Sequence, residues 1–488
     1  MSELPEGWTG TTLGEVCSKP QYGWTSKASR QGRIKYVRTT DISNGQMNWD
    51  DVPFCELEPE DVGKFRVRED DILVSRAGSV GVSFRMKDVP CEAVFASYLI
   101  RFNPLECVLP KYVEYFLNSD DYWRAISEFS AGIAVPNVNA SKLAELEVPL
   151  APLNEQRRIV AKLEKLLSRV DGAQARLATI PRIPKRFRQS VLAAACSGKL
   201  TADWREQNDR AEPYKTGCSD TSLQLGNDIP LTWLATKLGS LTTLVTSGSR
   251  GWAEYYADSG SVFIRAQNIN TDKLLLNEVA YVSLPNTAEG RRTKVEQNDL
   301  LITITGANVT KSALVEVALD DAYVSQHVAL VRLSDKKLDR FVFFWVVSSE
   351  HGRGQLQEAA YGAGKPGLNL DNIRNILIAL PPFAEQQEIV RRVEALFKTA
   401  DALEARYRKA KAHVDKLTQS ILARAFRGEL VTTEAELARL EGRDYEPASV
   451  LLERIRQERA TTQQTSAKSK TKRMTRSKKD TATKKMFA

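Results

Sequence analysis

Two stretches of this sequence are copies of each other. Between residues 152–200 and 382–430, at a constant offset of 230, 17 of 49 positions are identical and no gap is needed. A looser match precedes each stretch, where Asp71–Ser75 corresponds to Asp299–Thr303. Self-similarity at a fixed offset indicates repeated structural units. The sequence therefore predicts a tandem duplication in which the second part of each copy is kept closely and the first part has diverged.

The first part of each copy alternates short β-rich stretches with turns. Tyr36–Thr40 and Ile72–Ser75 have counterparts at Val262–Arg265 and Leu300–Thr303, and Gly, Asn and Asp residues separate the stretches. Strands bounded by such turn residues, with a few helical patterns between them, are typical of a mixed domain. We expect an α/β domain of about 150 residues in each copy.

The second part of each copy has the apolar period of a coiled coil. Apolar or small residues follow a 4-3 spacing in both copies, first at Ile159, Leu163, Leu166, Val170, Ala173, Leu177 and Ile180, and then at Ile389, Val393, Leu396, Ala400, Leu403, Tyr407, Ala410, Val414, Leu417 and Ile421. A repeat of 3.5 residues marks a coiled-coil seam. Proline cannot donate to the helical ladder, so the first helix should break at Pro181–Pro184. The second should run unbroken from about 383 to 426, roughly 65 Å at 1.5 Å per residue.

These patterns predict an α+β fold. Two α/β domains are joined by two long helices packed as an antiparallel coiled coil, and the tandem repeat gives the whole a pseudo-two-fold axis. The alternative is that each helix packs only on its own domain. The predicted segments are 1–151 (first domain), 152–200 (first helical region), 201–228 (linker), 229–381 (second domain), 382–430 (second helical region), 431–460 (helical extension) and 461–488 (basic tail).

The positive charge of the chain is confined to its C-terminal tail. The net charge is +8, and residues 461–488 hold nine Lys/Arg and one Asp. Removing these from the 69 basic and 61 acidic residues leaves 60 of each, so the folded body carries no net charge. Any nucleic-acid surface on the body must therefore be a local patch. The Lys/Ser/Thr-rich tail is expected to be disordered, and either to hold DNA non-specifically or to serve as a solubilising extension.

Cysteine and histidine usage excludes several classes of site. The six cysteines include no C-x-x-C pair and there are only three histidines, which argues against a zinc site or a disulfide scaffold. Free cysteines favour a reducing, cytoplasmic setting. No apolar run approaches the roughly 18 residues of a membrane span, so we expect no membrane partner.

The search for catalytic residues finds only weak patterns. Gly362–Gly367 formally matches G-x-G-x-x-G but lacks a clear strand before it and a helix after it, so we interpret it as a loop. Asp321, Asp335 and Lys337 loosely resemble a nuclease pattern without a counterpart in the first copy. His327 lies in an apolar stretch and is interpreted as a core residue. We expect no catalytic residues, no metal and no cofactor bound by this chain.

The junction between the two parts of each copy resembles a known family. Pro-Leu/Phe-x-Glu-Gln-x-x-Ile-Val opens each helical region at 152–160 and 382–390, and Gln-Ser-x-Leu-x₅-Gly-x-Leu closes it. This unit, present twice behind α/β domains, resembles the DNA-specificity subunit of type I restriction–modification systems. Gly198–Arg205 and Glu446–Ile455 are similar to that family as well, and the resemblance covers about residues 4–458.

The resemblance implies a non-catalytic targeting subunit. Each domain would be a target recognition domain that reads one half of a split double-stranded DNA sequence, and the helices would dock two methyltransferase subunits. Those partners would use S-adenosylmethionine to methylate adenine N6, and restriction subunits would bring ATP- and Mg²⁺-dependent activity. Half-sites read by a two-fold protein lie in inverted orientation, and they should be one helical turn, ~35 Å, apart if both domains face the same side of the DNA. The alternatives are a coiled-coil scaffold with two protein-binding heads and no DNA role, or a stand-alone nuclease.

Candidate contact residues follow from comparing the copies. Unmatched polar or aromatic residues in and beside loops are candidates for base edges: Tyr22, Arg30, Arg33, Lys35, Arg76, Arg250, Trp252, Gln267, Asn268, Arg291, Arg292 and Lys311. Arg38 and Arg265 stand at equivalent positions, which favours a phosphate or structural role because the half-sites should differ. The helix starts are identical in both copies and are candidates for partner docking: Pro152, Glu155, Gln156, Pro382, Glu385 and Gln386.

Overall fold

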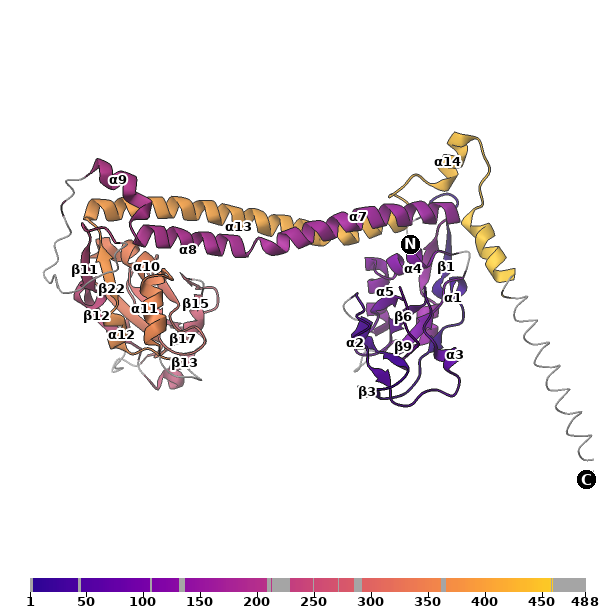
Figure 1. The fold of residues 1–488 in the computed structure, drawn as a ribbon, viewed down its shortest axis with the longest axis horizontal. Coiled ribbons are helices and arrows are strands. Elements are labelled where there is room, and N and C mark those ends of the chain that lie inside the picture. Colours follow the sequence, from indigo (N-terminus) through magenta and orange to yellow (C-terminus); the bar gives the residue numbers. More distant parts are fainter. Residues whose placement is uncertain are drawn as a thin grey trace, which may run out of the picture. The chain divides into compact units, whose positions relative to one another are not determined.

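The chain folds into two compact units. The computed structural model describes residues 3–42, 45–105, 108–130, 137–208, 212, 229–248, 250–270, 272–284, 292–360, 366–457 and 459. Unit 1 comprises Met1–Arg176 and Ala410–Ala488, and unit 2 comprises Leu177–Lys409. Each unit holds one α/β domain and parts of the long helices (Figure 1). We call residues 3–151 domain 1 and residues 229–381 domain 2.

The described strands of domain 1 form three small sheets. Their strand orders are β1-β10, β2-β9-β6-β7 and β3-β5-β4-β8. Only β4 and β8 pair in parallel; the other pairs are antiparallel. The strands are β1 Thr9–Thr12, β2 Gln21–Tyr22, β3 Ala28–Ser29, β4 Lys35–Val37, β5 Phe54–Cys55, β6 Ile72–Ser75, β7 Ser83–Arg85, β8 Ala93–Phe95, β9 Leu99–Phe102 and β10 Glu147–Leu150. The helices are α1 Leu13–Val16, α2 Thr39–Ile42, α3 Val62–Phe65, α4 Pro110–Phe116, α5 Asp120–Ser130 and α6 Ala140–Ala144.

Domain 2 repeats this topology strand for strand. Its sheets have the orders β11-β22, β12-β21-β18-β19 and β13-β17-β14-β20, and β14 pairs in parallel with β20 as β4 does with β8. The strands are β11 Leu234–Lys237, β12 Thr242–Ser247, β13 Tyr256–Ala257, β14 Ser261–Ile264, β17 Ala280–Val282, β18 Leu300–Thr303, β19 Ser312–Leu314, β20 Ala322–Val324, β21 Val328–Leu333 and β22 Leu377–Leu380, with an added hairpin of β15 Ile269–Asn270 and β16 Lys273–Leu274. The helices are η2 Leu238–Leu241, η3 Trp252–Tyr255, η4 Ala266–Asn268, η6 Lys336–Leu338, α10 Asp339–Val347, α11 Gly352–Ala359 and α12 Leu370–Arg374. The predicted duplication is confirmed.

The central strands separate two of the apolar cores within each domain. Successive side chains of a strand point to opposite faces. Ile72 and Val74 of β6 therefore pack into the core shared with the helices, while Leu73 packs into a second core against the sheet that contains β4. Leu300 and Leu301 of β18 divide in the same way. Burial on both faces explains why these strands read as continuous apolar runs.

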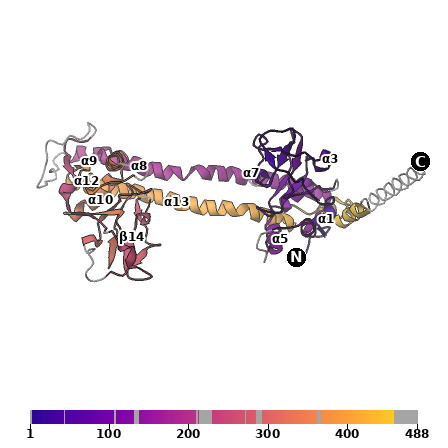
Figure 2. The same ribbon diagram turned by 90° about the horizontal axis from the view of Figure 1, so that it is seen from below.

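The long helices have the predicted ends. α7 spans Leu153–Thr179, α8 spans Arg182–Cys196, and α13 spans Phe383–Phe426 as one helix of 44 residues. The break between α7 and α8 falls at Pro181, within the predicted Pro181–Pro184 segment. Both predictions, the broken first helix and the unbroken second, are confirmed (Figure 2).

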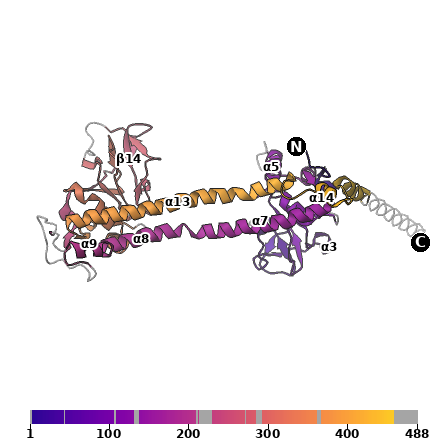
Figure 3. The same ribbon diagram turned by 90° about the horizontal axis from the view of Figure 1, so that it is seen from above.

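Within each unit the two helices lie side by side and antiparallel. In unit 1, Ile159 and Leu163 near the start of α7 share a core with Leu422 and Phe426 at the end of α13. In unit 2, the last turns of α8 share a core with the first turns of α13 in the same way (Figure 3). Each helix packs on its own domain and also on the helix from the other copy, so the alternative of separate helices is wrong.

Two positions depart from the predicted seam. Leu403 is 50% exposed, and Ala410 is exposed as well. Near the starts of α7 and α13 the seam is buried in the cores of the domains, as at Ile159 and Ile389. The domains supply additional packing partners there. The apolar period is the same at the buried and at the exposed seam positions. It could therefore not predict which of these residues are exposed.

The C-terminal extension belongs to the core of domain 1. α14 spans Glu434–Glu441, and residues 448–457 are helical. Leu451 and Ile455 are fully buried in the core that also contains Trp8 and Leu13. At the start of the predicted linker, the structure describes η1 (Lys199–Thr201), α9 (Ala202–Gln207) and the residue after α9. Most of 209–228 lies outside the described residues, as does the predicted tail 461–488.

Candidate DNA interface

Aromatic and basic side chains lie together at one end of the β2-β9-β6-β7 sheet of domain 1, and we call this group rim 1. We define it as Tyr22, Arg76, Tyr98 and Asn137. The Arg76 guanidinium lies 4.8 Å from the centroid of the Tyr22 ring, and Arg76 Nε donates to Asn137 Oδ1 at 3.4 Å. The Tyr22 hydroxyl accepts a hydrogen bond from the Ala140 amide at 2.9 Å, which fixes the ring. Two of the predicted base contacts, Tyr22 and Arg76, therefore form one arrangement.

Tyr98 was not predicted from the sequence. It lies in the turn between β8 and β9 and is 62% exposed. Its carbonyl accepts the Arg76 amide at 2.9 Å, so it stands beside the arginine. Aligning the turn Ser97–Tyr98 with Gln326–His327 of the second copy would have identified it as an unmatched loop residue.

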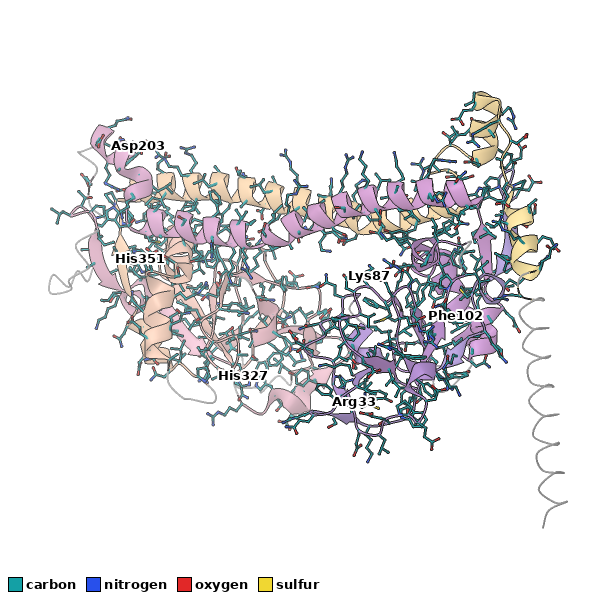
Figure 4. The ribbon with its side chains drawn as sticks, turned by 45° about the vertical axis from the view of Figure 1, so that its right-hand side comes forward. Arg33, Lys87, Phe102, Asp203, His327 and His351 are labelled. Atoms are coloured by element: carbon teal, nitrogen blue, oxygen red, sulfur yellow. The ribbon has the colours of Figure 1, made fainter. Side chains whose placement is uncertain are left out.

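The other predicted base contacts of domain 1 do not belong to rim 1. Arg30 is exposed. Arg33, with a side chain 63% exposed, forms ion pairs with Glu58 and Glu92 at 2.6 and 3.0 Å and lies on the side of the domain away from α7 (Figure 4). Lys35 donates to the Val52 carbonyl at 2.7 Å. Arg33 and Lys35 would have to give up these contacts to bind a base.

Rim 2 occupies the corresponding place in domain 2. We define it as Ile304, Thr305, Gln326 and His327. His327 is exposed in the turn between β20 and β21, on the side of the domain away from α8 and α13 (Figure 4). Its Nδ1 lies 2.5 Å from Thr305 Oγ1 and its Nε2 lies 3.3 Å from Gln326 Nε2. The interpretation of His327 as a core residue is wrong, because the apolar strand begins one residue later, at Val328.

A second polar group in domain 2 surrounds Lys311. Its ammonium donates to Asn308 Oδ1 at 2.8 Å and to Asn270 Oδ1 at 3.1 Å. The exposed Gln267 belongs to η4 next to Asn270, while Arg250 and Arg292 are exposed in other segments of domain 2. Arg291 lies outside the described residues.

Two predicted base contacts are structural residues. Trp252 is 5% exposed and stacks on Phe263 at 5.5 Å between ring centroids. Asn268 is 3% exposed, accepts from the Arg265 amide at 3.0 Å and donates to the Glu278 carbonyl at 3.0 Å. The prediction that these two residues contact bases is wrong, because both are buried inside the domain, where aromatic and amide side chains serve as well as in a turn.

Arg38 and Arg265 share a structural setting. Asp41 Oδ2 accepts the Arg38 amide at 2.8 Å, as Asn268 accepts the Arg265 amide. The Arg38 guanidinium also pairs with Asp41 Oδ1 at 2.8 Å, and this hydrogen bond raises the pKa of Arg38. These contacts favour the structural alternative for Arg38.

The predicted docking residues at the helix starts are enclosed by the chain. Pro152, Glu155, Gln156, Pro382, Glu385 and Gln386 are all buried. Glu155 Oε1 accepts the Trp8 indole N–H at 2.9 Å and Oε2 accepts the Glu434 amide at 2.8 Å. Burial raises the pKa of Glu155. Direct docking through these six side chains is not supported by the structure, because a partner could not reach them.

The second helix start uses a matching set of contacts. Glu385 Oε2 accepts the Trp233 indole N–H at 3.0 Å, and Oε1 accepts from Thr201 Oγ1 at 2.7 Å and from Arg205. Gln156 and Gln386 each donate to the carbonyl five residues earlier, at 2.9 and 2.8 Å. The identity of the two helix starts therefore reflects a duplicated internal anchor.

Catalytic sites are not apparent among the described residues. No group of His, Cys, Asp and Glu side chains in this part of the chain could hold a metal ion. Asp321 accepts from Ser261 and pairs with Lys294 at 3.4 Å, and Asp335 accepts the Lys337 amide at 2.9 Å to cap η6. These are local structural contacts. Most of the Gly362–Gly367 segment lies outside the described residues.

Comparison with known proteins identifies the family. The sequence matches the family described as the type I restriction modification DNA specificity domain, over residues 5–182 and 232–412. The chain belongs to this family. The type I restriction enzyme StySPI specificity subunit of Salmonella potsdam is 30% identical over 475 residues, 94% of this chain and 96% of that protein. The EcoBI specificity subunit of Escherichia coli is 35% identical over 348 residues, 70% of each.

Solved structures share the fold of this specificity subunit. The HsdS subunit from Thermoanaerobacter tengcongensis matches with a TM-score of 0.54 and 20% identity, over 88% of this chain and 98% of that one. A chain from a structure of complex assembly and conformational transition in the type I R-M system matches with a TM-score of 0.65 and 19% identity, over 88% and 100%.

Family membership sets the role of the molecule. As a type I specificity subunit, the chain supplies DNA sequence specificity, and the scaffold alternative without a DNA role is not favoured. None of the helices in the described segments is long and apolar enough to cross a membrane.

Proposed function

We propose that each domain reads one half of a bipartite double-stranded DNA target and that bound methyltransferase subunits carry out the reaction. The observation that supports this most is that the two domains have the same topology but expose different side chains. Domains 1 and 2 share their strand orders, including the parallel pair, whereas domain 1 carries Tyr22, Arg76 and Tyr98 at its rim and domain 2 carries Gln326 and His327. A duplicated reader with divergent contact residues suits two different half-sites.

The chemistry belongs to partner subunits in this proposal. Two methyltransferase subunits would bring S-adenosylmethionine and flip an adenine out of the duplex for methylation at N6. Restriction subunits with ATP- and Mg²⁺-dependent activity would join the same assembly. The four cysteines that the structure describes are free thiols, which suits assembly in the cytoplasm.

Partner docking requires surfaces other than the buried helix starts. The exposed faces of the long helices are the candidates that remain, because the six identical residues at the starts are enclosed by the chain. Charged residues cover these faces, as at Arg157, Glu164 and Arg391.

Exchange of one domain tests this function. Residues 1–151 are replaced by the corresponding segment of another specificity subunit, and the complex with methyltransferase subunits is expressed in a host strain. Single-molecule sequencing of methylated adenines should show one half of the target changed and the other half retained. A change in both halves, or methylation without any bipartite motif, would contradict the proposal.

A further inference from the structure

The backbone around the two rims is the same in both domains. The Arg76 amide donates to the Tyr98 carbonyl at 2.9 Å, and the Ile304 amide donates to the His327 carbonyl at 2.9 Å. The carbonyl of the same residue accepts from Val138 at 3.1 Å in domain 1 and from Leu368 at 2.8 Å in domain 2. Residues 76 and 98 of domain 1 therefore occupy the places of 304 and 327 in domain 2.

The opposite end of the strand that leads to each rim is also duplicated. Asp71 is fully buried and accepts from Asn103 at 2.9 Å, and Asp299 is 1% exposed and accepts from Arg332 at 2.9 Å. A glycine at the same place in each domain lets two backbone segments meet. A Cβ at Gly23 would lie 2.2 Å from the Phe95 carbonyl oxygen. The backbone that carries the two rims therefore has the same register in both domains.

The exposed side chains on this common scaffold differ completely. Domain 1 presents Arg76 on the Tyr22 ring beside Tyr98, and domain 2 presents Gln326 and His327 beside the buried Ile304. The shared backbone contacts do not require the exposed side chains to differ. Different ligands for the two rims explain the difference.

We propose that the two rims select bases in the two half-sites, with Arg76 contacting guanine in one half and Gln326, positioned by His327, contacting adenine in the other. The proposal rests on the proposed function, in which each domain reads one half-site. It adds the residues and the base class at one position of each half.

The geometry of Arg76 suits guanine. Its Nε is engaged by Asn137 and its plane lies over the Tyr22 ring, so the guanidinium is oriented before DNA binds. In the described part of the chain its two terminal nitrogens form no ion pair. Arginine presents such a pair of N–H groups to guanine O6 and N7. Prior fixation reduces the rotamer entropy lost on contact.

The geometry of rim 2 suits adenine. When His327 donates its Nδ1 proton to Thr305 Oγ1, its Nε2 accepts a hydrogen bond from the Gln326 amide nitrogen. One N–H of that amide and its oxygen then remain without a hydrogen-bond partner among the described residues, on the exposed Gln326 side chain. A glutamine amide binds adenine with this pair, donating to N7 and accepting from N6. His327 is a positioning residue here.

The experiment uses the full chain in complex with its methyltransferase subunits. The variants are R76I, which installs the residue of the second copy, and Q326A and H327F in domain 2. Each complex is assayed by sequencing methylated adenines and by competition between the target duplex and duplexes with one base changed. The matched controls are K87A and K336A, at exposed ion-paired lysines with side chains 51% and 62% exposed.

The expected result is a loss of preference confined to one base position. R76I should lower discrimination for a guanine in one half-site by about 5- to 150-fold, and Q326A should do so for an adenine in the other half. H327F should relax the same adenine position as Q326A while complex assembly is retained, which a purely structural role would not produce. The lysine controls should leave the motif unchanged.

The outcomes separate this inference from the function on which it rests. An unchanged motif in R76I and Q326A, in a complex where exchange of residues 1–151 alters one half, overturns the inference and leaves the function intact. Failure of the domain exchange overturns the function instead. If R76I does not assemble with the methyltransferase subunits, R76K, which keeps the charge but loses the planar fork, decides between the same two results.

Discussion

A buried glutamate anchors each helix start. Taking a carboxylate out of water costs several kcal/mol, and only well-placed donors offset that cost. Glu155 receives one hydrogen bond on each oxygen, from Trp8 and from the Glu434 amide, and Glu385 receives three, including one from Arg205. Removal of one donor should therefore destabilise the unit by more than an average hydrogen bond does.

Replacing Trp8 with phenylalanine tests the anchor. The aromatic ring is kept, but the indole N–H that donates to Glu155 is lost, and hydrogen bonds to charged groups contribute about 1.5–3 kcal/mol. We expect the free energy of unfolding of unit 1 to fall by that amount in urea titrations of the full chain. The control is Trp123→Phe, whose indole forms no hydrogen bond within the described part of the chain. Equal losses in the two variants would contradict the anchor.

The two glutamates of the anchor could be identified from the sequence, but their role as internal hydrogen-bond acceptors could not. Identity between the copies marked Glu155 and Glu385 as important, yet identity arises equally from shared partners and from shared internal contacts. Trp8 and Trp233 each follow a proline by three residues, so the sequence also matches them between the copies. Their bonds to the glutamates span 147 and 152 residues, which no local pattern reveals.

At the scale of elements, the two copies of the long helix differ in proline content. The α8 helix of the first copy contains proline, and the α13 helix of the second copy does not. Pro184 is the third residue of α8, where the missing N–H has no helical partner to lose. The offset of 230 places Val414 at the equivalent position, deep inside α13. The same residue type would therefore have opposite effects in the two copies.

The variant Val414→Pro is expected to break α13. Proline there removes the hydrogen bond to the carbonyl of Ala410 and clashes with it, which costs about 3 kcal/mol or more. We expect a loss of ellipticity at 222 nm and a matching loss of stability in urea. Val414→Ala controls for the side chain, and Pro184→Ala should retain the helix signal. A helix signal unchanged in Val414→Pro would show that α13 is not continuous at this point.

The helices could be predicted from the sequence to within a few residues, and the domains only in class. Nearby proline and glycine residues set the ends of α13. The apolar period of this helix can be read from the sequence without knowledge of tertiary contacts. The sheets are different, because β2 pairs with β9 and β4 pairs in parallel with β8 across long loops. The C-terminal helix at 448–457 was expected as an extension, but its burial in domain 1 depends on contacts with residues such as Gly7, more than 400 positions away.

At the scale of the whole molecule, charge is divided between a neutral body and a basic tail. Residues 1–460 hold equal numbers of acidic and basic side chains, and residues 461–488 carry the entire net charge of +8. Neutral proteins bind DNA through local patches, whereas counterion release makes binding by a basic segment steeply salt-dependent. Sequence selection and non-specific attraction should therefore be separable in this chain.

Deletion of residues 461–488 should weaken binding without altering the methylated sequence. Each phosphate contact by one of the nine Lys/Arg contributes about −0.9 to the slope of log K against log salt concentration, so the slope should decrease in magnitude by up to about 8. Fluorescence anisotropy with a target and a scrambled duplex, from 50 to about 200 mM salt, measures this change. A full-length variant with glutamine at the nine positions should behave like the deletion, because charge rather than length is responsible. An altered methylation motif in either variant would mean that the tail takes part in sequence selection, and an unchanged slope would mean that it does not contact DNA.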